Sequence, residues 1–176
     1  MQIPIVLTVI SPDRTGVVES IARTVADHGG NWLESRMCRL GGEFAGILRL
    51  EIPADKKSAL LDALQKLQQN GLQIVIRADQ PAAVAVAGRQ TRLEIVGSDR
   101  PGIVREITCA LARAGVNVEE FTSEVVSAPM SGETLFKAAA RLQLPGPCDL
   151  ATLKKDLEKI AADLLVDVSF EEISGK

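Results

Sequence analysis

Two short segments of this sequence combine residue types that suit the binding of a small carboxylate. They are Asp13-Arg14-Thr15-Gly16-Val17 and Asp99-Arg100-Pro101-Gly102-Ile103, and each lies between an apolar run and a helical pattern. A helix N-terminus exposes unpaired backbone N–H groups and a partial positive charge, and a glycine there lets a ligand approach the backbone closely. The aspartate suits a ligand ammonium group, and the arginine suits a carboxylate. Both segments are therefore candidate sites for a small amino or carboxylic acid.

The candidate ligand-binding residues are these two segments, a serine next to each and an asparagine further along the chain. They are Ser11, Asp13, Arg14, Thr15, Gly16, Val17 and Asn31, and Ser98, Asp99, Arg100, Pro101, Gly102, Ile103 and Asn117. In the second set, which has the fuller motif, we expect the ligand to bind where the Asp99–Ile103 turn meets Asn117.

Each of these residue types also has a structural explanation. The aspartates suit helix N-caps, and the arginines suit solvated or surface-paired positions. The glycines allow tight helix–sheet packing, and the asparagines are common turn residues. Both interpretations stay open at this point.

The two segments belong to an internal repeat. At an offset of 86 residues Asp13 matches Asp99, Gly16 matches Gly102 and Asn31 matches Asn117. Further along the offset grows to 92, where Leu50 matches Leu142, and the extra residues fall in the turn-like stretch 126–132. Ordered matches with one gap in a turn indicate two copies of one domain.

Both copies have the same predicted element order, strand-helix-strand-strand-helix-strand. The first helix of each copy ends at a glycine, and the next two strands form a hairpin. In copy one the expected ranges are strand 3–10, helix 16–28, strands 31–40 and 43–52, a helix from residue 53 to the Asn70-Gly71 stop, and strand 72–78. In copy two they are strand 91–97, helix 102–114, strands 116–127 and 133–144, helix 149–163 and strand 165–172.

This order predicts an α+β protein made of two ferredoxin-like βαββαβ domains. Right-handed crossovers place both helices of a copy on one face of a four-stranded antiparallel sheet. We expect domain 1 at residues 1–79, a linker at 80–90 and domain 2 at 91–176. Because each sheet keeps one face and its edges uncovered, we also expect the copies to pack on each other and the chain to form a homodimer.

Composition argues against several functional classes. The chain has 176 residues, a net charge of −3, 3% aromatic residues and no basic run, which argues against direct binding of nucleic acid. We expect no membrane segment, and the three scattered cysteines suit reduced thiols in the cytoplasm. With His28 as the one histidine and no metal-ligand spacing, we expect no catalytic site, no metal and no cofactor.

The motif Asp-Arg-x-Gly-(Ile/Val)-Val after a first strand, with Gly-x-Asn at the start of the next, resembles the ACT domain. Copy two, with Asp99 to Val104 and Gly115-Val116-Asn117, is closer to the family pattern than copy one, where Thr15 replaces the proline. The resemblance covers nearly the whole chain. It implies a fold that senses small ligands, usually amino acids, at interfaces between domains.

Among ACT proteins, a tandem without an enzyme domain is similar to the glycine cleavage system transcriptional repressor family. That resemblance implies a regulatory protein that binds an amino acid and acts through a protein partner, without touching DNA itself. The alternative is a protein–protein interaction scaffold of ACT domains that binds no ligand. A ligand-induced rise in melting temperature separates the two hypotheses.

Overall fold

The computed structural model divides the chain into two compact units, Met1–Pro81 and Ala82–Lys176, here called domain 1 and domain 2. It describes residues 1–69, 71–79, 88–128 and 132–172. Domain 1 consists of β1 (Gln2–Pro12), α1 (Val17–Asp27), β2 (Asn31–Leu40), β3 (Glu43–Pro53), the 3-10 turn η1 (Ala54–Lys56), α2 (Lys57–Gln68) and β4 (Gln73–Ala78). Domain 2 consists of β5 (Gly88–Ser98), α3 (Ile103–Arg113), β6 (Asn117–Ser127), β7 (Thr134–Pro145), α4 (Leu150–Leu164) and β8 (Val166–Glu172).

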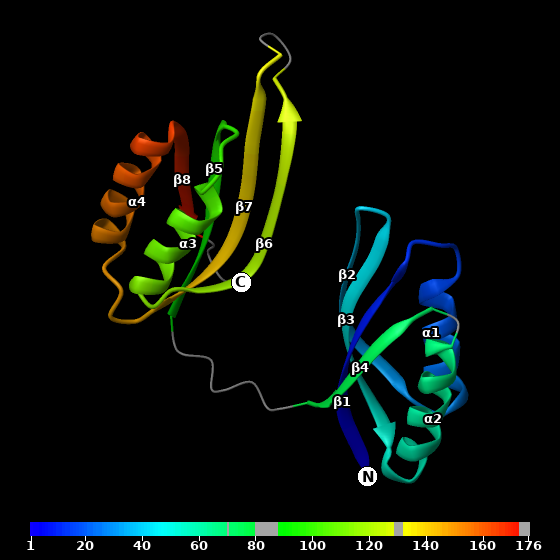
Figure 1. The fold of residues 1–176 in the computed structure, drawn as a ribbon. Helices are drawn as coiled ribbons and strands as arrows, with labels where there is room; N and C mark the ends of the chain where they lie inside the picture. Colours follow the sequence, from blue (N-terminus) through cyan, green and yellow to red (C-terminus); the bar gives the residue numbers. More distant parts are fainter. Residues whose placement is uncertain (70, 80–87, 129–131, 173–176) are drawn as a thin grey trace. The chain divides into compact units, whose positions relative to one another are not determined.

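Each domain is one four-stranded antiparallel sheet with two helices on a single face (Figure 1). The strand order is β2-β3-β1-β4 in domain 1 and β6-β7-β5-β8 in domain 2. Every neighbouring pair within a sheet is antiparallel, so β1 and β2 run in the same direction, as do β5 and β6. The α+β, ferredoxin-like expectation is therefore confirmed in both copies.

Several element boundaries differ from the sequence expectation by a few residues, and three starts bear on the candidate loops and the linker. Helices α1 and α3 begin one residue later than expected, because Gly16 and Gly102 adopt left-handed backbone conformations. Strand β5 begins at Gly88, so the last three residues of the expected linker belong to the sheet. The rest of that linker, residues 80–87, lies outside the described residues, as does the expected helix stop at Asn70, so the linker stays a prediction.

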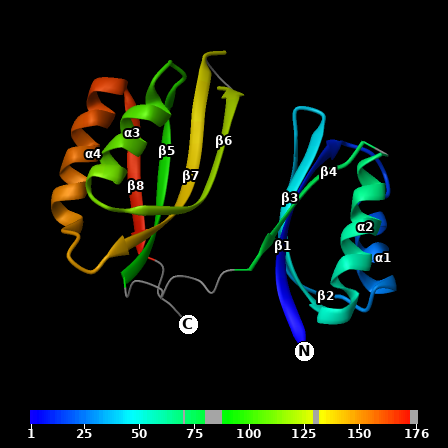
Figure 2. The same ribbon diagram turned by 60° about the horizontal axis from the view of Figure 1, so that its bottom comes forward.

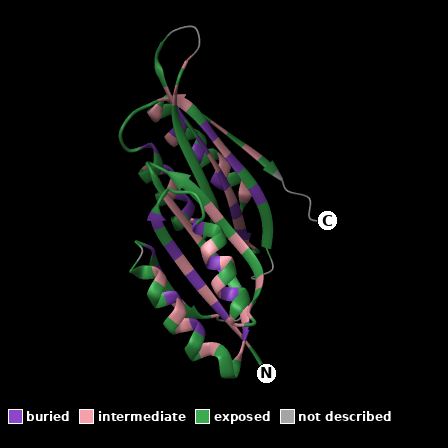
Figure 3. Cartoon of the chain, turned by 90° about the vertical axis from the view of Figure 1, so that its right-hand side faces the viewer, coloured by how far each residue is buried: buried purple, intermediate pink, exposed green. Residues whose placement is uncertain are grey.

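The core of each domain lies between the sheet and its two helices (Figure 3). In domain 1, alternate residues of β1 and β3 point toward the helices, as the two-residue period of a strand requires. They meet one stripe of α1 and one of α2. The buried residues are Ile5, Leu7, Val9, Leu48, Leu50 and Ile52 from the strands, and Val17, Ile21, Val25, Leu60 and Leu64 from the helices.

Domain 2 repeats this core with a different distribution of side-chain sizes on β7 and α3. Its buried residues include Leu93, Ile95, Phe136, Ala138, Ala140, Leu142 and Leu144 from the strands, and Ile103, Ile107, Ala110, Leu111, Leu153 and Leu157 from the helices. Ala140 stands where domain 1 has Leu48, and Leu111 on α3 stands where domain 1 has the smaller Val25, so a loss of volume on the strand accompanies a gain on the helix.

The sheet faces away from the helices differ between the domains. In domain 1, Ile10, Ile47 and Val75 are 42%, 55% and 53% exposed on that face, and Ile47 and Val75 both flank Thr8. In domain 2 the same face carries Arg92, which forms an ion pair with Glu94 at 3.0 Å. Domain 1 therefore exposes more large aliphatic side chains on this face, although it also carries the Arg49–Asp79 ion pair there.

One helix N-terminus is capped by a side chain. Asp149 precedes α4 and accepts hydrogen bonds from the Thr152 hydroxyl at 2.6 Å and from the Ala151 N–H at 3.0 Å. These two bonds favour the carboxylate, and they hold the pKa of Asp149 below its ordinary value.

We expect core truncations to act on one domain at a time. Leu50 and Leu142 are equivalent, fully buried positions, and Leu→Ala costs about 2–5 kcal/mol of unfolding free energy. Trp32, the one tryptophan, packs against the core of domain 1 and reports on that domain alone. Leu50→Ala should lower the urea midpoint measured by Trp32 fluorescence. Leu142→Ala should leave that midpoint unchanged and lower the midpoint of the domain 2 transition measured by circular dichroism. An equal shift of the Trp32 transition in Leu142→Ala would show that the domains unfold as one unit.

We expect the Asp149 cap to make the stability of domain 2 depend on pH. Because the pKa of Asp149 is lower in the folded chain, its stabilisation is complete above the unfolded pKa of about 4 and is lost as the pH falls through the folded value. Asp149→Ala should lower the urea midpoint of domain 2 at pH 7 and have a smaller effect at pH 3. The matched variant Asp149→Asn keeps an acceptor without the charge, so its midpoint should be less sensitive to pH. An Asp149→Ala deficit that is equal at both pH values would contradict this prediction.

Candidate functional site

The loop from β1 to α1 leaves the start of the helix open. Gly16 occupies the N-cap position with φ 90° and ψ 2°, and no side chain caps the helix. A Cβ added to Gly16 would meet nothing within 4 Å, so the first turn faces free space. A glycine is favoured because a side chain strains this left-handed conformation. The unpaired N–H groups of the first turn are therefore available to an anion.

The loop from β5 to α3 repeats this geometry in domain 2. Gly102 is the N-cap with φ 101° and ψ −12°, again without a side-chain cap and with nothing within 4 Å of an added Cβ. The N-cap interpretation of Asp13 and Asp99 is therefore wrong, because each aspartate lies three residues before the glycine that fills that position. Both helix N-termini lack the carboxylate that Asp149 gives to α4.

The two aspartates have different surroundings. The Asp13 carboxylate forms an ion pair with the Arg39 Nε at 2.6 Å, and the Asp13 N–H donates to the Gly42 carbonyl at 2.8 Å. The β2–β3 hairpin thus holds the loop and neutralises its acid. In domain 2 the Asp99 N–H donates to the Thr134 carbonyl at 3.0 Å.

Asp99 has no equivalent of Arg39. An offset of 86 residues from Arg39 leads to Val125, an apolar residue. Within the part of the chain that the structure describes, the Asp99 carboxylate makes no hydrogen bond or ion pair. Asp99 is therefore an exposed acid beside an open helix N-terminus, whereas Asp13 already has a cation.

Ser11 is the second difference between the loops. It follows Ile5, Leu7 and Val9 on the helix-facing side of β1 and is 2% exposed. Its Oγ has no hydrogen-bond partner among the described residues. Leaving a buried hydroxyl unpaired costs about 1–3 kcal/mol, and such a group in a native protein calls for a water or a ligand.

Domain 2 has Gly97 where domain 1 has Ser11. A Cβ at Gly97 would lie 2.5 Å from the Val166 Cα and 2.6 Å from the Leu165 carbonyl oxygen. The backbone between α4 and β8 therefore excludes any side chain there. The loop of domain 1 offers a buried hydroxyl, and the loop of domain 2 offers a free carboxylate.

The asparagines do not join the loops within one domain. Asn117 pairs with Gln143, which pairs with Gln90 on β5, whereas the loop begins eight residues further along β5 at Ser98. Eight residues of strand span about 26 Å. Figure 2 shows the β5–α3 loop and the start of β6 at opposite ends of domain 2.

Domain 1 repeats this separation. Asn31 pairs with Glu51, which pairs with Pro4, whereas Ser11 pairs with Phe44 at the other end of the sheet. The expectation that the Asp99–Ile103 turn meets Asn117 within one copy is wrong. One ligand therefore does not contact both groups within one domain.

The remaining reactive groups are scattered. The His28 Nδ1 lies 2.7 Å from the Thr24 carbonyl oxygen in the last turn of α1, and Cys38, Cys109 and Cys148 are free thiols. The described residues contain no cluster of three or more His, Cys, Asp or Glu side chains able to hold a metal ion. None of the helices in the described ranges has the length and hydropathy needed to cross a bilayer.

The sequence pattern found the two loops but missed the groups that distinguish them. Arg39, Gly97 and Thr134 decide what each loop offers, and none was a candidate. The 86-residue offset itself contained part of the signal, since it pairs Ser11 with Gly97 and Arg39 with Val125.

Comparison with known proteins places this fold and these loops in a family. Residues 4–77 and residues 91–136 each match an ACT domain. The chain is 24% identical over 170 residues to the glycine cleavage system transcriptional repressor of Escherichia coli (strain K12), covering 91% of this chain and 85% of the repressor.

Two solved structures cover the chain almost completely. A protein of unknown function from Galdieria sulphuraria is 30% identical, with a TM-score of 0.84 over 99% of this chain and 100% of its own. A structure assigned as a candidate glycine cleavage system transcriptional repressor is 19% identical, with a TM-score of 0.68 over 99% of each chain, and supports the fold. This chain belongs to the ACT-domain family, with two ACT domains in tandem.

Proposed function

We propose that this protein is a regulatory module that binds a small amino acid and acts through a protein partner, without catalysis. The most direct support is the pair of uncapped helix N-termini at Gly16 and Gly102. A helix N-terminus without its own cap presents N–H donors and a partial positive charge, and both favour a carboxylate. Membership of the ACT family supports the regulatory part of this function.

Domain 2 is the better candidate for an amino acid. An amino acid needs donors for its carboxylate and an acceptor for its ammonium group. The first turn of α3 supplies the N–H groups, and Asp99 supplies an exposed carboxylate with no partner in the described part of the chain. In this arrangement Pro101 fixes the turn, Ser98 and Arg100 flank it, and Ile103 begins the helix beneath it.

Domain 1 has different chemistry. Arg39 already neutralises Asp13, so the loop lacks a free acid for an ammonium group. The buried Ser11 hydroxyl and the open first turn of α1 suit a plain anion or an ordered water. The ion pair at Asp13 supports the alternative function, a scaffold without an amino-acid ligand, for this domain. Arg14, Thr15 and Val17 complete the candidate residues of this loop.

The separation of loop and asparagine bears on how the site is assembled. An amino acid is several times shorter than the 26 Å or so that separates the Asp99 loop from Asn117 along β5. In this proposal a second copy of the chain completes the residue set in a homodimer, with the Asp99 loop of one protomer near Asn117 of its partner.

The action on transcription belongs to the same proposal. The E. coli relative is a transcriptional repressor of the glycine cleavage system. This chain has a net charge of −3, which does not favour the DNA backbone. A protein partner in the cytoplasm is therefore the proposed target.

We expect an amino acid to bind the Asp99 loop of domain 2, with Asn117 supplied by a second copy of the chain. A thermal-shift screen of the twenty amino acids and of one-carbon metabolites should give a hit, because a ligand of the native state raises apparent stability. Calorimetric titration with that hit should show affinity about tenfold or more weaker in Asp99→Asn, which loses a charge-assisted bond. Asn117→Ala should cost about 1–2 kcal/mol for one hydrogen bond.

Matched variants in domain 1 serve as controls. Asp13→Asn and Asn31→Ala change the same residue types in domain 1, where the Asp13 carboxylate already forms an ion pair with Arg39. Full affinity in Asp99→Asn together with a loss in Asp13→Asn would move the amino-acid site to domain 1. No thermal shift with any compound in the screen would favour the scaffold.

We also expect the purified chain not to bind duplex DNA at physiological salt. Binding would have to release counterions through several Lys or Arg contacts to phosphates, and this acidic chain has no basic run. Fluorescence anisotropy with a labelled duplex should show no saturable binding below about 10 µM protein. That concentration lies within the range of dissociation constants typical of non-specific DNA binding. Sub-micromolar binding that weakens with added salt would refute a purely protein-mediated action.

A further inference from the structure

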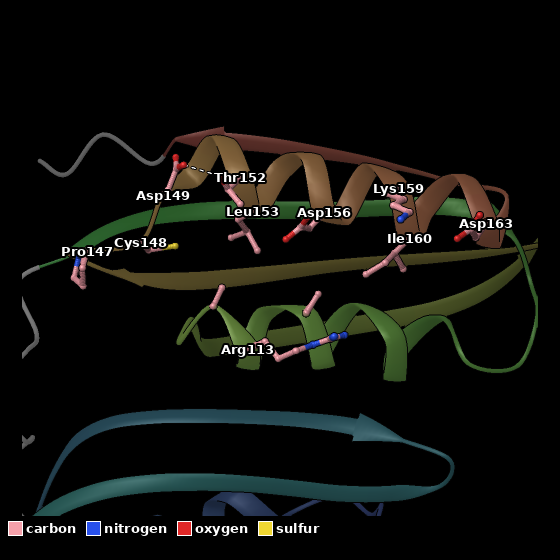
Figure 4. A pocket seen from close by; sticks show the side chains of 12 residues that line it. Arg113, Pro147, Cys148, Asp149, Thr152, Leu153, Asp156, Lys159, Ile160 and Asp163 are labelled. Carbon is pink, nitrogen blue, oxygen red and sulfur yellow. Dashed lines mark hydrogen bonds between the residues drawn. The ribbon is translucent and has the colours of Figure 1, made fainter.

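Helices α3 and α4 of domain 2 border a groove on their outer side, away from the sheet. It has a volume of about 630 Å³ and is lined from both helices (Figure 4). Its apolar lining comes from Ala110 and Ala114 on the α3 side and from Leu153 and Ile160 on α4. The groove extends along α4 from Asp149 to Asp163, a length of about 21 Å.

The small residues that open this groove are absent from domain 1. The 86-residue offset pairs Ala110 with Thr24 and Ala114 with His28. In domain 1 both side chains are half-buried, and the His28 ring is bonded to the Thr24 carbonyl at 2.7 Å. The same fold therefore has larger side chains at the positions where domain 2 has two alanines.

A row of aspartates borders the apolar lining. Asp149, Asp156 and Asp163 recur every seven residues, and at 3.6 residues per turn they form one row next to Leu153 and Ile160. Figure 4 shows Asp156 pointing toward α3. Asp149 is bonded to its own helix, whereas Asp156 and Asp163 are exposed and make no hydrogen bond or ion pair within the described residues.

Two cations also line the groove but lie less centrally. Lys159 belongs to the next row of α4, farther from the apolar lining than the aspartates. The Arg113 Nε donates to the Cys109 carbonyl of its own helix at 3.3 Å. An approaching segment therefore meets small apolar side chains first, with carboxylates along one side.

We propose that the α3–α4 groove docks a basic amphipathic α-helix of a partner protein. Apolar side chains at three- and four-residue spacing would pack on Ala110, Ala114, Leu153 and Ile160, and small residues on one helix let another helix approach closely. Lys or Arg side chains repeating every seven residues would face Asp156 and Asp163, as flanking charges do in coiled coils. A helix of about 14 residues matches the length of the groove. This inference rests on the proposed function, for which it supplies the surface that meets the protein partner.

The test is a titration of the isotope-labelled full chain with a synthetic peptide. The probe is an 18-residue helix with leucine and alanine on one face and lysines flanking that face at seven-residue spacing. Amide shifts in the NMR spectrum should change on α3 and α4 and not on α1 and α2. A scrambled peptide of the same composition and a version with glutamate in place of lysine should not bind.

Two sets of variants distinguish binding of the peptide in the groove from a general attraction of a basic peptide to an acidic protein. Ala110→Thr with Ala114→His copies the side chains of domain 1, fills the groove and should weaken binding about tenfold or more. Asp156→Lys with Asp163→Lys should abolish binding of the lysine peptide and create binding of the glutamate peptide. Asp62→Lys, at an exposed acid on α2, should change neither affinity.

Several results would overturn this proposal. They are peptide affinity that is unchanged by both groove variants, shift changes centred on the sheets or the β–α loops, and no binding at millimolar peptide. A dimer in sedimentation that Ala110→Thr with Ala114→His converts to monomer would assign the groove to a second copy of this chain instead. Asp99→Asn should bind the peptide with unchanged affinity. Loss of the amino-acid proposal would therefore show in the amino-acid titration alone, and loss of the groove proposal in the peptide titration alone.

Discussion

One-sided burial of each sheet is the constraint on which the rest of the structure depends. Both helices of a domain must cover the same face, so the chain crosses that face after the first strand and returns to the end where the strand began. The first and second strands consequently run in the same direction, as β1 and β2 do, and β5 and β6. This topology places the β–α loop at one end of the sheet and the asparagine at the other. It also leaves the opposite face of each sheet uncovered.

The sequence predicted the fold because the repeat and the local signals agree with each other. The Gly41-Gly42 pair marks the β2–β3 turn, leucines at helical spacing mark α2 and α4, and an apolar, β-branched run marks β1. The start of β5 was missed because a glycine followed by two polar residues is typical of a linker. In the structure Gly88 pairs with Pro145, and an added Cβ would lie 2.0 Å from the Leu144 carbonyl oxygen, so the glycine marks close contact between strands.

The site was predicted less completely, for reasons that differ from residue to residue. The loops themselves follow from the motif. The N-cap is the residue directly before the first helical residue, and Asp13 and Asp99 each lie three residues before that position. The separation of Asp99 from Asn117 already follows from the predicted strand order, because the end of one strand and the start of a parallel strand lie at opposite ends of a sheet. The Asp13–Arg39 pair depends on which hairpin side chain reaches the loop, and no local pattern encodes that contact.

The two copies share their fold and differ in what they expose. Domain 1 has a neutralised acid, a buried hydroxyl and a more aliphatic open face, whereas domain 2 has a free acid and a groove between its helices. Helix α3 takes part in both proposed surfaces of domain 2. Its N-terminus at Gly102 faces the candidate ligand, and Ala110 and Arg113 near its other end line the groove. A helix of 11 residues is about 16 Å long, so the candidate ligand site and the groove lie at the two ends of one rigid element. A ligand and a partner that favoured different positions of α3 would therefore change each other's affinity by the same factor.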